Sequence, residues 1–250
     1  YPLPEQAEEA KAKRRMGLGV TGVANALEYL GLPYGSPGFL GKLADVLGTV
    51  AICAYETSID LAKEKGPFPL WDRDQFSKDF IHHLEGEYQD RYFETGIRNS
   101  HLLSIAPTGT ISLTADNISS GIEPVFAYSF DRTINTPEGV RVETITDYGV
   151  RELGVYGKRA DECTIEDHLG VLLVASKWVD SAVSKTCNVG ADVTFDNFKG
   201  LYVRAYEGGA KGCTTFRSAG KRKGVLVSAP QEGEGAACYI DPETGAKSCE

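Results

Sequence analysis

The sequence predicts an α/β fold in which helices alternate with strands that pair in parallel. Two observations carry this prediction. Several long segments have apolar residues at every third or fourth position, as helices with one buried face do. Short apolar runs, bounded by glycine and polar residues, stand between the helical segments of the second half and are typical of strands. This alternation favours parallel pairing, because a helix supplies the crossover that joins two parallel strands.

The N-terminal part of the chain predicts two helices. Residues 5–15 are mostly charged, so a solvated helix is expected there. Apolar residues between Val20 and Leu30 have helical spacing, and Gly31 is expected to end this second helix.

A long amphipathic helix is expected next. Ser36 is a typical N-cap residue, and Pro37 suits the first helical position. Apolar residues then recur with helical spacing until Gly66, so one face is expected to be buried. Cys53 lies in this apolar stretch and is expected in the core. Residues 74–94 predict a further, more polar helix.

The second half of the chain predicts the alternating elements. Thr164 and Asp167 resemble a capping box, which starts a helix expected to run to about Val183. The other elements are short and are bounded by glycine or polar residues. They comprise strands at 101–106, within 183–189 and at 212–217, a turn at 136–139 and a helix at 195–207.

Composition excludes several classes of protein. The 250 residues carry 26 basic and 35 acidic side chains, and this net charge of −9 disfavours binding to a nucleic acid backbone. No apolar run reaches the roughly 20 residues that span a bilayer, so no membrane association is expected. The first residues are charged, unlike a secretory signal, and no cysteine spacing resembles a zinc site. We therefore expect a cytoplasmic protein with free thiols and no metal site.

The segment Gly17–Gly22 matches the G-x-G-x-x-G pattern of dinucleotide-binding proteins. That fingerprint requires an apolar strand directly upstream, whereas this chain has a charged, helical segment there. The acidic residue expected about 20 positions later would be Asp45, in the middle of a predicted helix. We favour close packing of backbone between two helices, with an unrelated dinucleotide-binding α/β domain as the alternative.

A second glycine-bearing segment is the candidate anion site. It follows the predicted strand 101–106 and offers hydroxyl groups around a central glycine, whose flexibility lets backbone N–H groups turn toward one point. Without a lysine it is no Walker loop. The candidate phosphate-binding residues are Pro107, Thr108, Gly109, Thr110, Ile111 and Ser112. Loops of this composition also occur without any ligand, so residue types alone leave both readings open.

Four segments, in matching order and spacing, resemble the large chain of ribonucleotide reductases. They are residues 14–34, 62–71, 101–126 and 184–222. In that family the sequence around Pro107–Ser112 cradles the diphosphate of the substrate. The resemblance implies that residues 1–230 form the second half of a ten-stranded α/β barrel, with residues 231–250 as a flexible tail.

The resemblance implies reduction of ribonucleotides, with ribonucleoside diphosphates the expected substrates, by thiyl-radical chemistry. The family's radical cysteine and general base precede the region that this chain resembles, and Cys53, Cys163, Cys187 and Cys213 do not match their positions. The chain is thus expected to be a fragment that is inactive alone and is completed by a missing N-terminal half. The alternative is the non-catalytic half of a naturally split reductase.

The resemblance also indicates how the radical is generated. The iron-dependent reductases pass the radical through two adjacent tyrosines, and this chain has no Tyr-Tyr pair. Its segment Cys213–Arg217 looks more like the adenosylcobalamin-dependent class, so adenosylcobalamin is the implied cofactor. None of the four histidines lies in a known cobalamin-binding motif.

Family members often end in a flexible segment whose two cysteines re-reduce the active site by thiol exchange. Cys238 and Cys249 are the candidates here, and a thioredoxin- or glutaredoxin-type reductant is the implied partner. Their separation exceeds the family's usual gap, although Asp241-Pro242 suggests a turn between them. Two unrelated surface thiols are the alternative.

Overall fold

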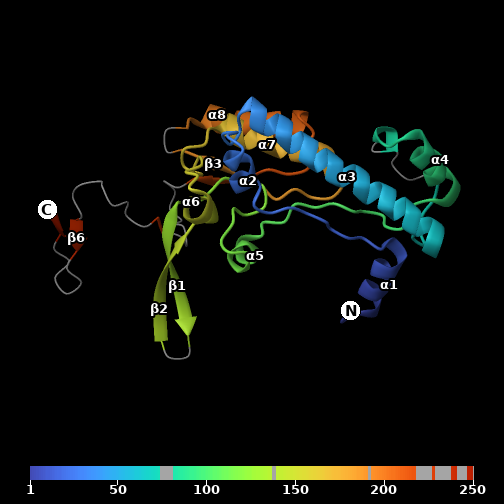
Figure 1. Ribbon diagram of the computed structural model, residues 1–250, viewed down its shortest axis with the longest axis horizontal. Helices are drawn as coiled ribbons and strands as arrows, with labels where there is room; N and C mark the ends of the chain where they lie inside the picture. The colour runs from blue at the N-terminus through green and yellow to red at the C-terminus, as the bar shows by residue number, and fades with distance from the viewer. Residues whose placement is uncertain are drawn as a thin grey trace. The chain divides into compact units, whose positions relative to one another are not determined.

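The computed structural model describes residues 1–73, 81–136, 139–190, 193–217, 227–228, 238–240 and 247–249. The chain divides into two compact units, one formed by Tyr1–Tyr128 and Thr146–Lys223, the other by Ser129–Ile145 and Gly224–Glu250. Helices and strands alternate along the second part of the first unit, as the α/β prediction requires (Figure 1). The predicted boundary at residue 230 lies outside the described residues and stays a prediction.

Parallel pairing organises the first unit. Leu18 pairs with Leu103 as an isolated parallel bridge, and the pair Ile105 and Val183 forms a second one. Just after Val183 in the sequence, β3 (Thr186–Val189) pairs in parallel with β4 (Thr214–Arg217). Parallel pairing is therefore confirmed.

The N-terminal helices agree with the sequence prediction. Helix α1 (Pro4–Lys13) buries none of its residues, and α2 (Val23–Tyr29) follows a short extended segment. Helix α3 (Pro37–Lys65) begins where predicted, because the side chain of Ser36 accepts a hydrogen bond from a backbone N–H of the first turn. It ends at Gly66, whose φ of +80° suits glycine.

Helix α3 packs against α7 (Ile165–Trp178) along one buried face (Figure 1). Leu43 and Ala51 are buried on this face, whereas Cys53 is exposed. The prediction that Cys53 lies in the core is wrong. Cys53 lies two positions after Ala51, which is about 200° around the helix axis, and its side chain therefore points away from the core.

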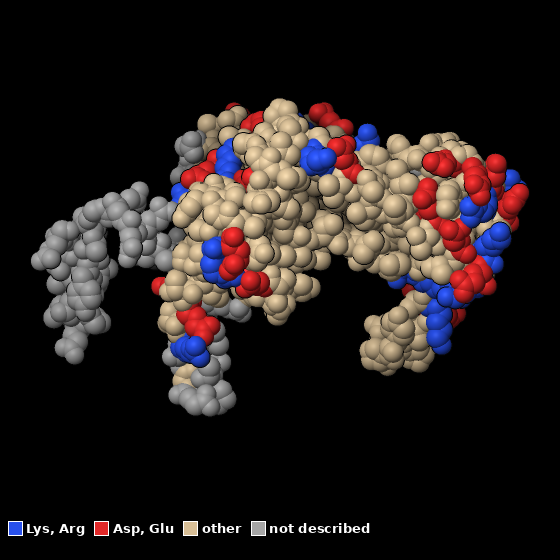
Figure 2. All heavy atoms as spheres, in the orientation of Figure 1, with Lys and Arg blue, Asp and Glu red and all other residues tan. Residues whose placement is uncertain are grey.

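Helix α3 is also the one helix, among the described residues, that is long and apolar enough to cross a membrane by length and composition. Core helices meet the same criterion. Its buried residues belong to the main hydrophobic cluster of the first unit, together with residues of α2 and α7. Charged side chains gather near α1 and α4 (Gly86–Thr95), while the middle of the face in Figure 2 is largely uncharged.

Two predicted helices differ from those observed. Within 74–94, residues 74–80 lie outside the described part, Ile81–His83 form a 3₁₀ turn (η1), and α4 begins only at Gly86. Helix α7 starts with the predicted capping box but ends at Trp178, not at about Val183. The chain turns extended at Val179 because the following residues pair with residues 103–105.

The remaining elements of the first unit are short. Helix α5 (Gly109–Thr114) begins within the segment 107–112, which was expected to be a loop, and α6 spans Tyr148–Leu153. Helix α8 (Phe195–Glu207) ends at Gly208, as predicted. The predicted strand 101–106 pairs only through isolated bridges.

The second unit contains two sheets. Strands β1 (Ser129–Thr136) and β2 (Gly139–Thr146) flank the predicted turn, whose residues 137 and 138 lie outside the described part, and β5 (Val227–Ser228) adds to β1. Strands β6 (Cys238–Ile240) and β7 (Lys247–Cys249) pair in antiparallel fashion. Most of the predicted flexible tail, residues 231–250, lies outside the described residues, so its flexibility stays a prediction.

Candidate functional site

The candidate phosphate loop turns sharply at Thr108. This residue has φ +52° and ψ 17°, a left-handed conformation that is costly for a β-branched side chain. Its hydroxyl oxygen accepts a hydrogen bond from the backbone N–H of Gly121, at 2.7 Å, and lies 3.0 Å from the hydroxyl of Thr21. These two contacts hold the strained turn in place.

The turn exposes the first amides of α5. Ser112 N–H makes the first helical bond, to the carbonyl oxygen of Thr108 at 2.7 Å. The preceding N–H groups of Gly109, Thr110 and Ile111 have no hydrogen-bond acceptor within the described part of the chain, and all three residues are exposed. They follow the carboxyl end of a parallel segment, where ligands bind in α/β sheets.

The predicted hydroxyl donors differ in availability. Thr110 is exposed, and its hydroxyl has no hydrogen-bond partner among the described residues. Ser112 is buried, and its hydroxyl donates to the carbonyl oxygen of Gly109 and contacts the hydroxyl of Ser120 at 3.0 Å. Thr110 is therefore available to a ligand, while Ser112 supports the loop from inside.

The turn that follows the loop is anchored by an ion pair between a partly exposed glutamate and a buried lysine. Glu123 accepts a hydrogen bond from the ammonium group of Lys185 at 2.6 Å and another from the backbone N–H of Thr186, also at 2.6 Å. The Lys185 side chain is fully buried. Sequence reasoning assigned Glu123 no role and missed Lys185, whose only signal is its place before a buried strand. The pair fixes the turn to the start of β3.

His168 completes the environment of Lys185. Its Nδ1 accepts a hydrogen bond from the ammonium group at 2.9 Å, because an ammonium can only donate. Burial, together with the nearby positive charge of Lys185, lowers the pKa of His168 to about 3. The imidazole is thus neutral at physiological pH, and its Nε2 has no hydrogen-bond partner within the described residues.

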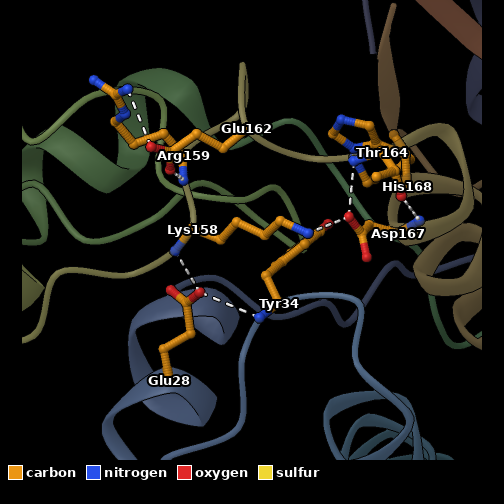
Figure 3. A network of polar contacts seen from close by, with 9 residues as sticks. Glu28, Tyr34, Lys158, Arg159, Glu162, Thr164, Asp167 and His168 are labelled. Atoms are coloured by element: carbon orange, nitrogen blue, oxygen red, sulfur yellow. Dashed lines mark hydrogen bonds and ion pairs between the residues drawn. The ribbon is translucent and has the colours of Figure 1, made fainter.

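A further polar network ties α2 to the start of α7 (Figure 3). The carboxylate of Glu28 accepts hydrogen bonds from the backbone N–H groups of Tyr34, at 3.2 Å, and Lys158, at 2.7 Å. The ammonium group of Lys158 in turn pairs with Asp167, the capping-box residue next to His168. Burial raises the pKa of Glu28. This network fixes the helix that carries His168.

Close packing explains the glycines of the segment Gly17–Gly22. A Cβ atom on Gly17 would lie 2.4 Å from the hydroxyl oxygen of Ser104, and one on Gly19 would lie 2.3 Å from the carbonyl oxygen of the same residue. The preference for close backbone packing is confirmed. Its partner is the extended segment around Ser104, not a second helix as expected.

A cavity of about 540 Å³ lies between the N-terminal parts of α7 and α8. Its lining includes Asp161, Glu166 and Asp196 against one arginine, Arg204, which already pairs with Glu166. The acidic lining disfavours a phosphate group, so the cavity does not compete with the loop as a phosphate site.

The two predicted tail cysteines, Cys238 and Cys249, lie on paired strands. Cys238 and Cys249 are directly opposed backbone partners in the β6–β7 pair. The turn expected between them is therefore compatible with the backbone, although residues 241–246 lie outside the described part. Of the other cysteines, Cys187 and Cys213 approach each other, with 3.8 Å between their sulfur atoms.

Comparison with known proteins accounts for most of the chain. The family model for the ribonucleotide reductase barrel domain matches residues 1–216. A vitamin B12-dependent ribonucleoside-diphosphate reductase of Mycobacterium tuberculosis is 32% identical, over 91% of this chain and 34% of its own length. A reductase of the same name from Thermoplasma acidophilum is 29% identical, over 93% and 32%.

A ribonucleoside-diphosphate reductase subunit alpha of Chlamydia pneumoniae is 26% identical, over 87% of this chain and 26% of its own length. The chain thus spans about a third or less of the length of these curated relatives. The family model covers far more than half of the residues, including the loop, its anchoring turn and β3. The chain therefore belongs to the ribonucleotide reductase barrel-domain family.

Proposed function

We propose that this chain is part of a ribonucleotide reductase, forms the second half of its ten-stranded α/β barrel, and binds the substrate's diphosphate at residues 107–112. The observation that carries the proposal is the group of three exposed amides at Gly109, Thr110 and Ile111, which have no acceptor within the described residues. Backbone N–H groups that point to one place bind phosphate oxygens well. The family match extends across this segment.

The proposed substrate is a ribonucleoside diphosphate, which agrees with the names of the relatives. The loop itself contains no lysine or arginine, so neutral amides and the Thr110 hydroxyl would bind the diphosphate. The strained turn at Thr108 and the anchor at Glu123 keep these donors in position before substrate arrives. Reduction would be completed by residues of the reductase that lie outside this chain.

Adenosylcobalamin is the proposed cofactor, because the relatives with the higher identities are named vitamin B12-dependent. It would supply the radical when bound. Two of the four histidines already have partners: the Nδ1 of the buried His168 is bonded to Lys185, and the Nδ1 of His101 lies 3.0 Å from the hydroxyl of Ser100. Within the described residues, no three histidine, cysteine or acidic side chains gather as a metal ligand set. No step is therefore assigned to residues of this chain through the cofactor.

The proposed role of Cys238 and Cys249 is to re-reduce the active site by thiol exchange with a thioredoxin- or glutaredoxin-type protein. Their direct opposition in β6 and β7 supports a cooperating pair over two unrelated thiols.

Substitution of the free hydroxyl tests the phosphate loop. Thr110→Ala in the complete reductase should raise KM for the ribonucleoside diphosphate about 10- to 100-fold. This range corresponds to the loss of one hydrogen bond to a charged group, which contributes roughly 1.5–3 kcal/mol. Thr108→Ala should raise KM as well, because it releases the backbone N–H of Gly121 and so loosens the turn that positions the loop. Steady-state kinetics measure both effects.

Thr114→Ala is the matched control. Thr114 ends the same helix, and its hydroxyl already has a partner, because it donates to the carbonyl oxygen of Ile111. Its KM should be unchanged. Equal KM values for Thr110→Ala and the unsubstituted enzyme would refute the proposed site.

A further inference from the structure

We propose that Cys187 and Cys213 form a second dithiol site, at which a low-molecular-weight disulfide reacts with Cys213 and Cys187 then closes an internal disulfide. Their sulfur atoms lie 3.8 Å apart. This site goes beyond the proposed ribonucleotide reduction, because neither residue matches the positions expected for the radical and reducing cysteines of the family. It also differs from the tail pair, Cys238 and Cys249.

The register of the parallel strands places both thiols on one face. Cys187 is the backbone partner of Thr215, and Cys213 precedes Thr215 by two positions. Because side chains alternate along an extended chain, residues 213 and 215 point to the same side. The two thiols are therefore diagonal neighbours across β3 and β4.

The structure leaves room for the remaining movement. A disulfide requires a sulfur–sulfur distance of about 2.05 Å, so the two atoms must come closer. Cys213 lies just before the start of β4, outside the paired strand, and nothing lies within 4 Å of a Cβ atom added to the adjacent Gly212. Cys213 can move toward β3 while Cys187 stays within the ladder.

Burial and hydrogen bonding assign different roles to the two thiols. Cys187 is fully buried, whereas Cys213 is partly exposed. With the buried Cys187 as the donor, the hydrogen bond between the two thiols lowers the pKa of Cys213 to about 7. The same contact, followed by burial, raises the pKa of Cys187. Cys213 is thus the accessible nucleophile, and Cys187 is the resolving thiol.

The reaction balances with the disulfide as the oxidant. The Cys213 thiolate attacks one sulfur of R–S–S–R, forms a mixed disulfide and releases R–S⁻. This thiolate takes the proton of Cys187. The resulting Cys187 thiolate attacks the sulfur of Cys213, releases the second R–S⁻ to be protonated by water, and forms the internal disulfide. Two electrons pass from the cysteines to R–S–S–R.

Peptide mapping tests the proposal on the full chain. The reduced protein is incubated with oxidised glutathione at pH 7, alkylated, and digested with trypsin without reduction. Cleavage at lysine and arginine places Cys187 in peptide 186–199 and Cys213 in peptide 212–217. Mass spectrometry should find these peptides linked, with two hydrogen atoms fewer than their sum. Cys53, which is exposed, should carry only a glutathione adduct.

Two variants separate the roles. Cys187→Ala should trap the glutathione adduct on Cys213 and lower the alkylation rate of Cys213 at pH 7 about tenfold, because the donor that favours its thiolate is lost. Cys213→Ala should leave the buried Cys187 unmodified. Cys163→Ala is the matched control and should preserve the linked peptides, since burial raises the pKa of Cys163 to about 12.

Circular dichroism checks that each variant is folded, and the unsubstituted chain decides the question without any variant. A stable glutathione adduct on Cys213 with no linked peptides would overturn the proposal, as would a Cys213 that does not react. Neither result would bear on the phosphate loop, whose test is the KM for the diphosphate.

Discussion

Two glycine-containing segments of the first unit each have a sequence typical of a nucleotide- or phosphate-binding loop, but their surroundings in the fold differ. In the segment Gly17–Gly22, the space beside Gly17 and Gly19 is filled by Ser104. In the candidate phosphate loop, residues 107–112, nothing lies within 4 Å of a Cβ atom added to Gly109, and the neighbouring amides have no acceptor within the described residues.

The difference teaches that a glycine pattern indicates a ligand loop only where the glycine leaves space and free donors. Gly17 and Gly19 lack side chains so that one backbone segment can approach another. Gly109 instead begins a short helix whose first amides face open space. The turn that follows the candidate phosphate loop is also anchored, by the pair of Lys185 and Glu123.

The largest effect is expected when that anchor is broken. Lys185→Met should lower the free energy of unfolding by about 3–5 kcal/mol, because it leaves Glu123 without its buried partner. Urea denaturation measures this change. Adding Glu123→Gln should recover part of the loss by removing the unpaired charge, while Lys199→Met, at an exposed lysine, should change stability by less than about 0.5 kcal/mol. If Lys185→Met lost as little stability as Lys199→Met, the proposed anchoring role of the Lys185–Glu123 pair would be contradicted.

The next largest effect on stability is expected at Gly19, and Gly109 provides the comparison. Gly19→Ala should lower the free energy of unfolding by about 1–3 kcal/mol, because the new methyl group meets a backbone carbonyl oxygen that cannot move aside. Gly109→Ala is the matched substitution in open space, and its effect on stability should stay below about 1 kcal/mol. Thermal and urea denaturation compare the two variants. Equal losses would remove the distinction between the segments.

The pH dependence of stability gives an effect that is spread over several pH units. His168 has a pKa of about 3 in the fold, against 6.5 ordinarily, so below pH 6.5 the unfolded chain binds the extra proton. Stability should therefore fall as the pH drops from 6.5 toward 3, by at most about 1.4 kcal/mol per pH unit. His168→Gln, whose amide oxygen can still accept from Lys185, should flatten this slope in urea midpoints between pH 7 and 5.

The exposed His82 supplies the control for that measurement, and His82→Gln should keep the slope of the unsubstituted chain. A slope that is unchanged in His168→Gln would show that the buried imidazole does not govern acid stability.

Local sequence signals predicted the elements that depend on near neighbours. The Ser36 cap and the capping box of Thr164 and Asp167 both join residues three positions apart, and both are observed. The end of α7 was misplaced because residues after Trp178 pair with a segment more than 70 positions earlier. The prediction that Cys53 is buried was wrong because the apolar composition of a helical segment does not tell which side of the helix is buried.

The sequence by itself determined the capped starts of α3 and α7, the α/β class and the family, since caps, periodicity and motif order are properties of contiguous residues. Only the tertiary structure decided which glycine segment is open, that Lys185 is buried against Glu123 and His168, and that Cys187 lies beside Cys213. These contacts join residues separated by 17 to 87 positions. Their energy depends on burial and distance, which arise only when the folded chain brings remote segments together.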